Sequence, residues 1–108
     1  MKPATEILLS AAFVLTPKEN WTKGVCARDA KGREVNTDAP EARCFCVVGS
    51  FLATMDECGF GVEDYDAACD TFSRAMGSYC WAGDLNDTHT HAEVLDAIYK
   101  AAELSEAP

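Results

Sequence analysis

Residues 62–76 read VEDYDAACDTFSRAM, and this stretch decides the fold class. Its apolar residues recur at intervals of three and four, which is the spacing of one face of an α-helix. They are Val62, Tyr65, Cys69, Phe72 and Met76. The opposite face is acidic and carries Glu63, Asp66 and Asp70. The pattern therefore predicts an amphipathic helix that buries one side and exposes the other.

Two further helices are indicated near the ends of the chain. Residues 3–15 are apolar around most of the helix circumference and stop before Pro17, so this helix must be largely buried. Near the C-terminus, Thr90 and Glu93 form a capping box ahead of an apolar face. That face consists of Val94, Leu95, Ile98, Tyr99 and Ala102. Residues 105–108 are expected to fray.

A fourth helix is expected to begin within residues 36–38 and to run to about Met55. Asp38 is followed three residues later by Glu41, which is a capping pattern, and Pro40 suits a first turn. The apolar stripe of this helix is Phe45, Val48, Leu52 and Met55. A second stripe consists of small residues, Cys46, Gly49, Ser50 and Ala53. Small side chains let another backbone approach, and Cys46 and Gly49 are expected to pack against the C-terminal helix.

An extended segment, residues 21–35, is predicted to fold into a hairpin between the first two helices. Its turn lies at residues 29–32, where Gly32 can take the positive φ that hairpin turns often need. A two-stranded hairpin is only marginally stable alone. We therefore expect it to pack against the helices, with Trp21 as the anchor.

These elements predict one domain over residues 1–108. Its fold class is mainly α: a four-helix compact domain with a small β-hairpin between helices one and two. The 108 residues are 48% hydrophobic and 25% charged, which is ordinary for a globular fold. No apolar run is long enough to span a bilayer, so no membrane partner is expected. Residues 78–87 are expected to form a loop.

The net charge of −9 is unevenly distributed. Residues 1–36 carry six basic and four acidic residues, whereas residues 37–108 carry three basic and fourteen acidic residues. This balance disfavours direct binding to nucleic acid or to anionic lipid. The acidic surface either keeps a small protein in solution or docks a basic protein partner.

The candidate binding residues combine this acidic surface with nearby aromatic residues. They are Asp56, Glu57, Phe60, Glu63, Asp66, Asp70, Tyr79 and Trp81. If the aromatic side chains are exposed, they suit a protein interface, because aromatic anchors carry much of the binding energy. If they are buried, they only cover the core.

The six cysteines are Cys26, Cys44, Cys46, Cys58, Cys69 and Cys80. The apolar run near the start of the chain lacks a small-x-small cleavage site, so we expect a cytoplasmic protein with reduced thiols. A small metal-binding module is an alternative. Cys44 and Cys46, however, are separated by one residue, where zinc knuckles use about two to four. No metal and no cofactor are predicted.

Polar residues form a predicted structural network of Arg28, Asp29, Asn86 and Asp87. Arg28 is expected to pair with Asp29 or with Asp87, which would hold the hairpin on the segment before the last helix. The alternative is an exposed salt bridge in a turn, which contributes little. Asn86 and Asp87 can also cap the last helix.

Three motifs resemble the DUF6197 family of small uncharacterised bacterial and phage proteins. They are Trp21-x-x-Gly24-x-x-Ala27-Arg28-Asp29-x-x-Gly32, Ala42-x-x-Phe45-Cys46-x-x-Gly49 and Asn86-Asp87-x-x-Thr90-x-x-x-Val94. The resemblance extends from Trp21 to about Ala102. The chain departs from the family pattern in its additional cysteines and at Leu85, where the family often has Trp. The resemblance implies a common fold unit and a phage or bacterial origin, and it implies no reaction.

A thiol-dependent hydrolase is the alternative function. Cys46 would be the nucleophile, His89 or His91 the base, and Asn86 or Asp87 the group that orients the imidazole. Cys46, however, is expected more than one turn inside its helix and beside apolar residues, which does not favour a thiolate. A cationic imidazole is also unfavourable near a helix N-terminus. The preferred interpretation is that Cys46 is a small packing residue.

The sequence thus favours a small acidic accessory protein that acts by protein–protein binding. The most specific form of this hypothesis is a phage or mobile-element protein that inhibits a host nucleic-acid-handling protein through the acidic face. A homodimer formed through an aromatic or small-residue helix face is equally compatible with the pattern.

Overall fold

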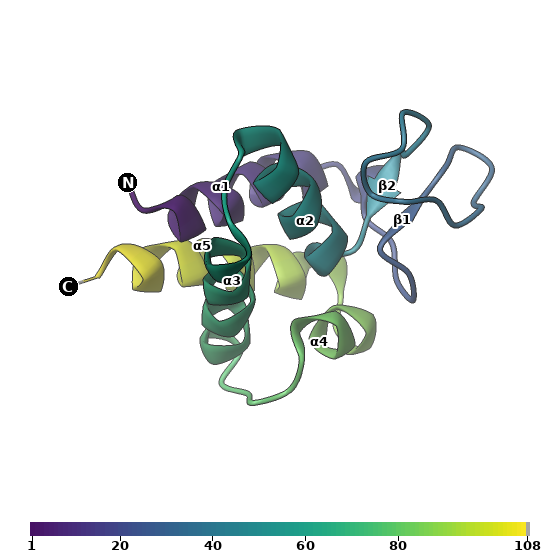
Figure 1. Cartoon of the computed structure of the whole chain (residues 1–108). Helices are drawn as coiled ribbons and strands as arrows, with labels where there is room; N and C mark the ends of the chain where they lie inside the picture. The colour runs from purple at the N-terminus through teal and green to yellow at the C-terminus, as the bar shows by residue number, and fades with distance from the viewer. Residues whose placement is uncertain (108) are drawn as a thin grey trace.

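The computed structural model describes residues 1–107, and its chain is mainly helical with a small two-stranded sheet (Figure 1). The elements are α1 (Pro3–Leu15), the 3-10 helix η1 (Lys18–Asn20), β1 (Ala27–Arg28), β2 (Cys44–Phe45), α2 (Val47–Cys58), α3 (Val62–Ala75), α4 (Ala82–Thr88) and α5 (His91–Glu106). The predicted fold class is confirmed in its coarse form. The predicted number of helices is wrong, because the described residues form five α-helices and not four.

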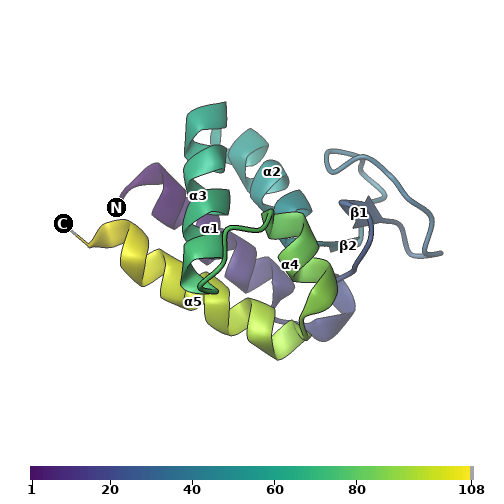
Figure 2. The same ribbon diagram turned by 90° about the horizontal axis from the view of Figure 1, so that it is seen from below.

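Helix α1 lies at the centre of the core, where it contacts α2, α3 and α5. Figure 2 shows α1 and α5 running side by side, with α3 crossing them. The buried apolar residues of α1 are Ala4, Ile7, Leu8, Ala11, Ala12 and Leu15. This burial confirms that residues 3–15 form a largely buried helix, although Phe13 is exposed.

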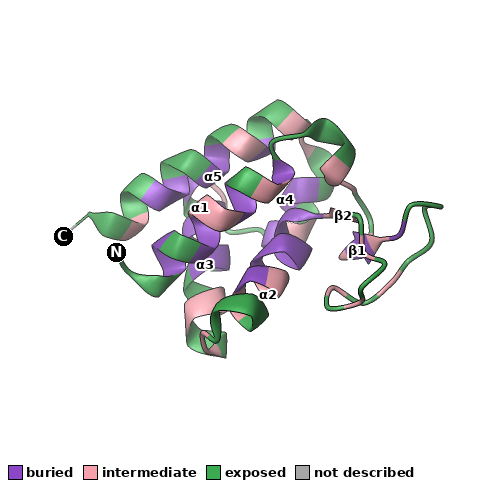
Figure 3. Cartoon of the chain, turned by 90° about the horizontal axis from the view of Figure 1, so that it is seen from above, coloured by how far each residue is buried: buried purple, intermediate pink, exposed green. Residues whose placement is uncertain are grey.

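The core is closed by buried residues of the other helices, which are purple in Figure 3. Phe51 of α2 and Phe72 of α3 are both fully buried and meet edge to face, with ring centroids 6.2 Å apart. Val94 and Ile98 of α5 complete this interior. The amphipathic pattern of residues 62–76 is confirmed as α3, whose first residue, Val62, is the exposed member of the stripe.

Helix α2 begins later than the sequence pattern predicted. It starts at Val47, and Cys46 is its N-cap, so the predicted start at residues 36–38 is wrong. Residues 36–43 instead run through turns without helix. The physical reason is the strand pairing. Cys44 and Phe45 are extended because they pair with β1, so these residues cannot be helical and α2 begins after them.

The predicted hairpin is replaced by a different pairing. A tight turn does occupy residues 29–32, with Gly32 at a φ of 81°, and a single bridge joins Arg28 to Glu34. The sheet itself, however, pairs β1 with β2 in antiparallel register, Ala27 opposite Phe45. The strands are therefore distant in sequence, and the chain between them projects away from the helices (Figure 1).

Two expectations about the C-terminal third are also wrong. Part of the predicted loop over residues 78–87 is helix α4, which begins at Ala82. Helix α5 does not fray at Ser105, because the Ser105 hydroxyl lies 2.8 Å from that of Thr5 and the Glu106 carboxylate accepts from Thr5 at 2.7 Å. Pro108, also predicted to fray, lies outside the described residues. The capping box of Thr90 and Glu93 is confirmed.

None of the helices in residues 1–107 combines the length and the apolar character needed to cross a membrane.

Candidate functional site

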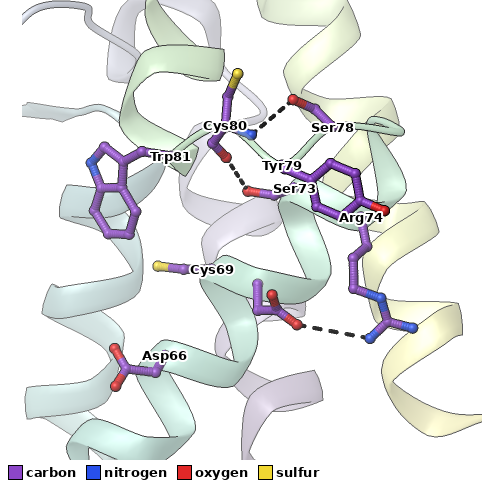
Figure 4. A pocket seen from close by; sticks show the side chains of 9 residues that line it. Asp66, Cys69, Ser73, Arg74, Ser78, Tyr79, Cys80 and Trp81 are labelled. Carbon is purple, nitrogen blue, oxygen red and sulfur yellow. Dashed lines mark hydrogen bonds and ion pairs between the residues drawn. The ribbon is translucent and has the colours of Figure 1, made fainter.

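A hollow of about 310 Å³ opens between α3 and the segment that leads into α4 (Figure 4). We call it the acidic hollow. It is lined by Asp66, Cys69, Asp70, Ser73, Arg74, Ser78, Tyr79, Cys80 and Trp81. Four of the predicted binding residues therefore lie around one cavity: Asp66, Asp70, Tyr79 and Trp81.

The aromatic residues of the acidic hollow are exposed, which answers the question that the sequence left open. Tyr79 is fully exposed, and Trp81 is 51% exposed. In Figure 4 the Trp81 indole and the Asp66 carboxylate stand on either side of the Cys69 thiol. An exposed indole beside a carboxylate can hold a cation by its ring face and by charge together.

The segment that carries the aromatic residues is held in place by hydrogen bonds to α3 and by one within the segment. The Ser73 hydroxyl donates to the Cys80 carbonyl at 2.9 Å, and the Cys80 amide donates to the Ser78 hydroxyl at 3.0 Å. Ser73 itself is buried. Trp81 is thus presented from an anchored backbone, which lowers the entropy cost of binding through it.

The charge of the acidic hollow is only partly balanced. Arg74 lies 3.9 Å from Asp70, but both side chains are more than half exposed, so this ion pair contributes little. Asp66 makes no ion pair within residues 1–107. A cationic group from outside can therefore pair with Asp66 directly and can displace Arg74 from Asp70.

The other predicted binding residues lie elsewhere. Asp56 and Glu57 are exposed at the end of α2, Glu63 is exposed in the first turn of α3, and Phe60 is half-buried between the two helices. Sequence reasoning also missed Ser73 and Arg74 in the acidic hollow. Their helical spacing from Asp66 and Asp70 places them on the same face of α3 and could have identified them.

Asn86 forms a second site, and only its predicted capping role is wrong. It does not cap the last helix, whose N-cap is Thr90, but is fully buried in α4. Its carboxamide oxygen accepts from the Trp21 indole at 2.7 Å and from the Val47 amide at 3.0 Å. Its nitrogen donates to the Thr22 carbonyl at 3.0 Å and to the Asp87 carboxylate at 3.2 Å. These contacts tie α2, α4 and the segment after η1 together.

The predicted pairing of Arg28 with Asp29 or Asp87 is wrong. Arg28 donates to the Thr22 hydroxyl at 3.0 Å and to two backbone carbonyls, those of Lys23 and Gly32. Each nitrogen of the guanidinium therefore donates to a neutral oxygen within residues 22–32. Arg28 is thus satisfied without a carboxylate partner.

Each of the two carboxylates has another partner. The Asp29 carboxylate accepts from the amides of Lys31 and Arg33 and pairs with the Arg33 guanidinium at 2.9 Å. Asp87 accepts from the Gly24 amide at 2.9 Å. Asp29 therefore organises its own turn, and Asp87 anchors the segment after η1 to α4.

Cys46 is buried, and its sulfur accepts from the Gly49 amide at 3.3 Å. As the N-cap of α2 it lies closer to the helix dipole than predicted. Burial nevertheless dominates and raises the pKa of Cys46 to about 11. Gly49 faces the backbone of Cys26 and not the C-terminal helix, because a Cβ on Gly49 would lie 2.0 Å from the Cys26 carbonyl oxygen.

The two histidines are half-buried rather than exposed, and their ring nitrogens are engaged elsewhere. His91 Nε2 lies 2.7 Å from the Leu15 carbonyl oxygen, and His89 Nδ1 lies 2.8 Å from that of Leu85. The His91 ring also packs on Trp21, with centroids 5.5 Å apart. Within residues 1–107 no hydrogen bond joins either imidazole to Cys46.

A smaller hollow of about 190 Å³ lies beside the start of α2. We call it the thiol hollow, because two cysteines face it. It is lined by Gly24, Val25, Cys26, Cys46, Val48, Trp81, Gly83, Asp84 and Asp87. All six cysteines of the chain are free. In the part of the chain that the structure describes, no group of three or more His, Cys, Asp or Glu side chains is arranged to hold a metal ion.

A model of a family of unknown function, DUF6197, matches residues 1–104. No curated protein and no solved structure matches the chain.

Proposed function

Because the chain belongs to DUF6197, a family of unknown function, no activity comes with its membership, and we propose from its geometry that it is a protein-binding module. Its acidic hollow receives a basic segment of a partner protein. The observation that carries this proposal is the gathering of Asp66, Asp70, Tyr79 and Trp81 around one cavity.

The chemistry of the acidic hollow fits an arginine or lysine side chain. The half-exposed indole of Trp81 offers a ring face, and the Asp66 carboxylate stands opposite without an ion-pair partner in residues 1–107. A guanidinium between them gains both a cation–π contact and an ion pair. The fully exposed Tyr79 extends the aromatic surface beyond the cavity.

The charge of the whole molecule supports a basic partner. The net charge is −9, and Arg74 is the only lysine or arginine between Cys44 and Tyr99. Such a field attracts cationic surfaces and repels nucleic acid. In its most specific form, the partner is a host protein that handles nucleic acid, whose basic groove the acidic face occupies. The setting we propose is the cytoplasm of a bacterium that carries a phage or a mobile element.

A fluorescein-labelled oligoarginine peptide is the probe that tests this proposal. We expect fluorescence anisotropy to show binding that weakens as the salt concentration rises. Trp81→Ala should raise the Kd by about tenfold or more, because an exposed aromatic anchor carries much of the binding energy. An oligoglutamate peptide of the same length should not bind.

The matched control separates the acidic hollow from general electrostatic attraction. Asp66→Asn with Asp70→Asn removes two charges from the hollow, and Asp56→Asn with Glu57→Gln removes two charges outside it. The first pair should weaken binding strongly, whereas the second should change the Kd by less than about twofold. Equal effects of the two pairs would contradict the proposal.

A second copy of the chain is the competing occupant. Analytical ultracentrifugation of the wild-type protein and of Trp81→Ala tests it. A dimer that Trp81→Ala dissociates would overturn the proposal of a basic partner in favour of a homodimer formed through the same aromatic surface.

A further inference from the structure

The register of the small sheet places two cysteines opposite each other. Ala27 pairs with Phe45 and Arg28 with Cys44, so the next position in the antiparallel register sets Cys26 against Cys46. The Cys46 amide donates to the Cys26 carbonyl at 3.1 Å, which continues the ladder by one residue. Residues that lie opposite each other in an antiparallel pair have Cα atoms about 4.5 to 5.5 Å apart, which is within the range that disulfides span.

The two side chains also face the same space. Cys26 and Cys46 both line the thiol hollow, and Cys26 is half-buried while Cys46 is 5% exposed. After burial, the Cys26 thiol is a further cause of the raised pKa of Cys46, which agrees with the closeness of the two side chains. Cys44, two residues before Cys46, has its sulfur 4.0 Å from the Arg28 carbonyl oxygen and does not line the hollow.

We propose that Cys26 and Cys46 form a reversible disulfide, a modification site that fastens β1 to the start of α2. The oxidant is a low-molecular-weight disulfide small enough to reach the thiol hollow. This inference is independent of the proposed binding function, because it rests on a different cavity and on the sheet register. Reversible pairs of this kind occur as redox sensors in compartments that keep most thiols reduced.

The exchange proceeds in two steps. The Cys26 thiol, the more exposed of the pair, loses its proton to solvent, and its thiolate attacks one sulfur of the oxidant. The oxidant S–S bond breaks, and its other half leaves as a thiolate that takes up a proton. The Cys46 thiol then loses its proton to solvent, and its thiolate attacks the Cys26 sulfur of the mixed disulfide. The second half of the oxidant leaves as a thiolate and is protonated. Two protein thiols are oxidised, and one small disulfide is reduced to two thiols.

The high pKa of Cys46 agrees with its role as the thiol that attacks the mixed disulfide in the second step. A thiol with a pKa of about 11 is a poor target for reagents in solution, but its reaction with Cys26 is intramolecular, and such reactions have high effective concentrations. The bond closes the chain between β1 and β2 into a covalent loop and leaves the backbone of the Cys46 cap unchanged.

The experiment is a disulfide map of the full-length chain after incubation with oxidised glutathione. Remaining thiols are blocked with N-ethylmaleimide, and the protein is digested with trypsin and Glu-C without reduction. Trypsin releases Cys26 in residues 24–28, and the second protease leaves Cys44 and Cys46 together in one peptide. We expect mass spectrometry to find these two peptides linked, and the link to disappear after dithiothreitol.

Single serine variants identify the partner of Cys26. Cys46→Ser should abolish the link and still fold, because serine is a good N-cap. Cys44→Ser is the matched control and should leave the link intact, as should Cys80→Ser. The proposal is overturned if residues 24–28 stay unlinked, if they link to a peptide that carries Cys58, Cys69 or Cys80, or if the link survives Cys46→Ser.

Discussion

The indole nitrogen of Trp21 donates a hydrogen bond to the side-chain oxygen of Asn86 at 2.7 Å, across 65 residues of sequence. The same oxygen receives the Val47 amide at the start of α2. One buried carboxamide therefore organises three segments that the chain brings together only on folding. Its replacement is the first of four predictions.

Asn86→Ala should lower the free energy of unfolding by about 3 kcal/mol, because it leaves the Trp21 indole and the Val47 amide without their acceptor. Urea unfolding followed by circular dichroism measures this loss. The control is Asn36→Ala, an exposed position, where a change below about 0.5 kcal/mol is expected. If both variants lose the same stability, Asn86 does not have the role described.

Gly49→Ala should destabilise the protein by about 2 kcal/mol, although alanine is the better helix former. The new Cβ would lie 2.0 Å from the Cys26 carbonyl oxygen, so the backbone of the strand segment must move. Thermal unfolding gives the measurement. Gly83→Ala is the matched control, since its Cβ meets the Trp81 side chain, which can rotate away. Gly83→Ala should be neutral or stabilising, and a neutral Gly49→Ala would refute the close packing.

Asp29→Asn should reduce the dependence of stability on acid pH. The Arg33 amide is the largest cause that holds the pKa of Asp29 below 3.8; burial opposes it, and the Arg33 guanidinium and the Lys31 amide lower the pKa further. As pH falls below 3.8, the unfolded chain takes up the proton first, so the folded state loses stability until its own lower pKa is passed.

The measurement for Asp29 is the unfolding free energy of both proteins across acid pH. The advantage of the wild type over Asp29→Asn should be full above pH 3.8 and should disappear at lower pH. Asp38→Asn serves as the control, because Asp38 is exposed and its side chain makes no hydrogen bond in the described residues. A constant difference at all pH values would contradict the role of the Asp29 charge.

The thiols should differ in their rates of alkylation by iodoacetamide near neutral pH. Cys58 and Cys80 are exposed and should react first. Cys46 and Cys69 should react at least about tenfold more slowly, because burial raises their pKa values to about 11 and about 12. Peptide mass spectrometry over time gives the order, and fast labelling of Cys46 would revive the hydrolase interpretation.

The helices that could be predicted from the sequence are those whose signals are local. The bounds of α1 agree with the apolar run of residues 3–15, and α3 and α5 follow from their apolar stripes and, for α5, from the capping box. Each pattern lies within the element that it describes, so no distant contact had to be known.

The start of α2 and the strand pairing could not be predicted because they depend on contacts distant in sequence. Asp38 and Glu41 resemble a cap, but the pairing of Cys44 and Phe45 with β1 overrides it. Helix α4 has seven residues and includes Gly83, which weakens its pattern. The burial of Asn86 has no local signal, since a polar residue before Asp87 suits a surface as well.

The candidate site was predictable in part for a similar reason. The carboxylates of α3 share a helix face that the sequence shows, and the cavity appears only when the segment with Trp81 folds back over it. The exposure of Trp81 follows from that path of the chain and not from the identity of the residue.

The segment between β1 and β2, residues 29–43, is joined to the rest of the molecule mainly through a sheet of two residues per strand. Extra chain near Asp38, which is exposed, would cost little, since each doubling of a loop's length adds only about 0.6 kcal/mol of closure entropy. This segment is therefore the natural place to graft an epitope tag or a fluorescent reporter. Chains of different length can also be accommodated there without disturbing the helices.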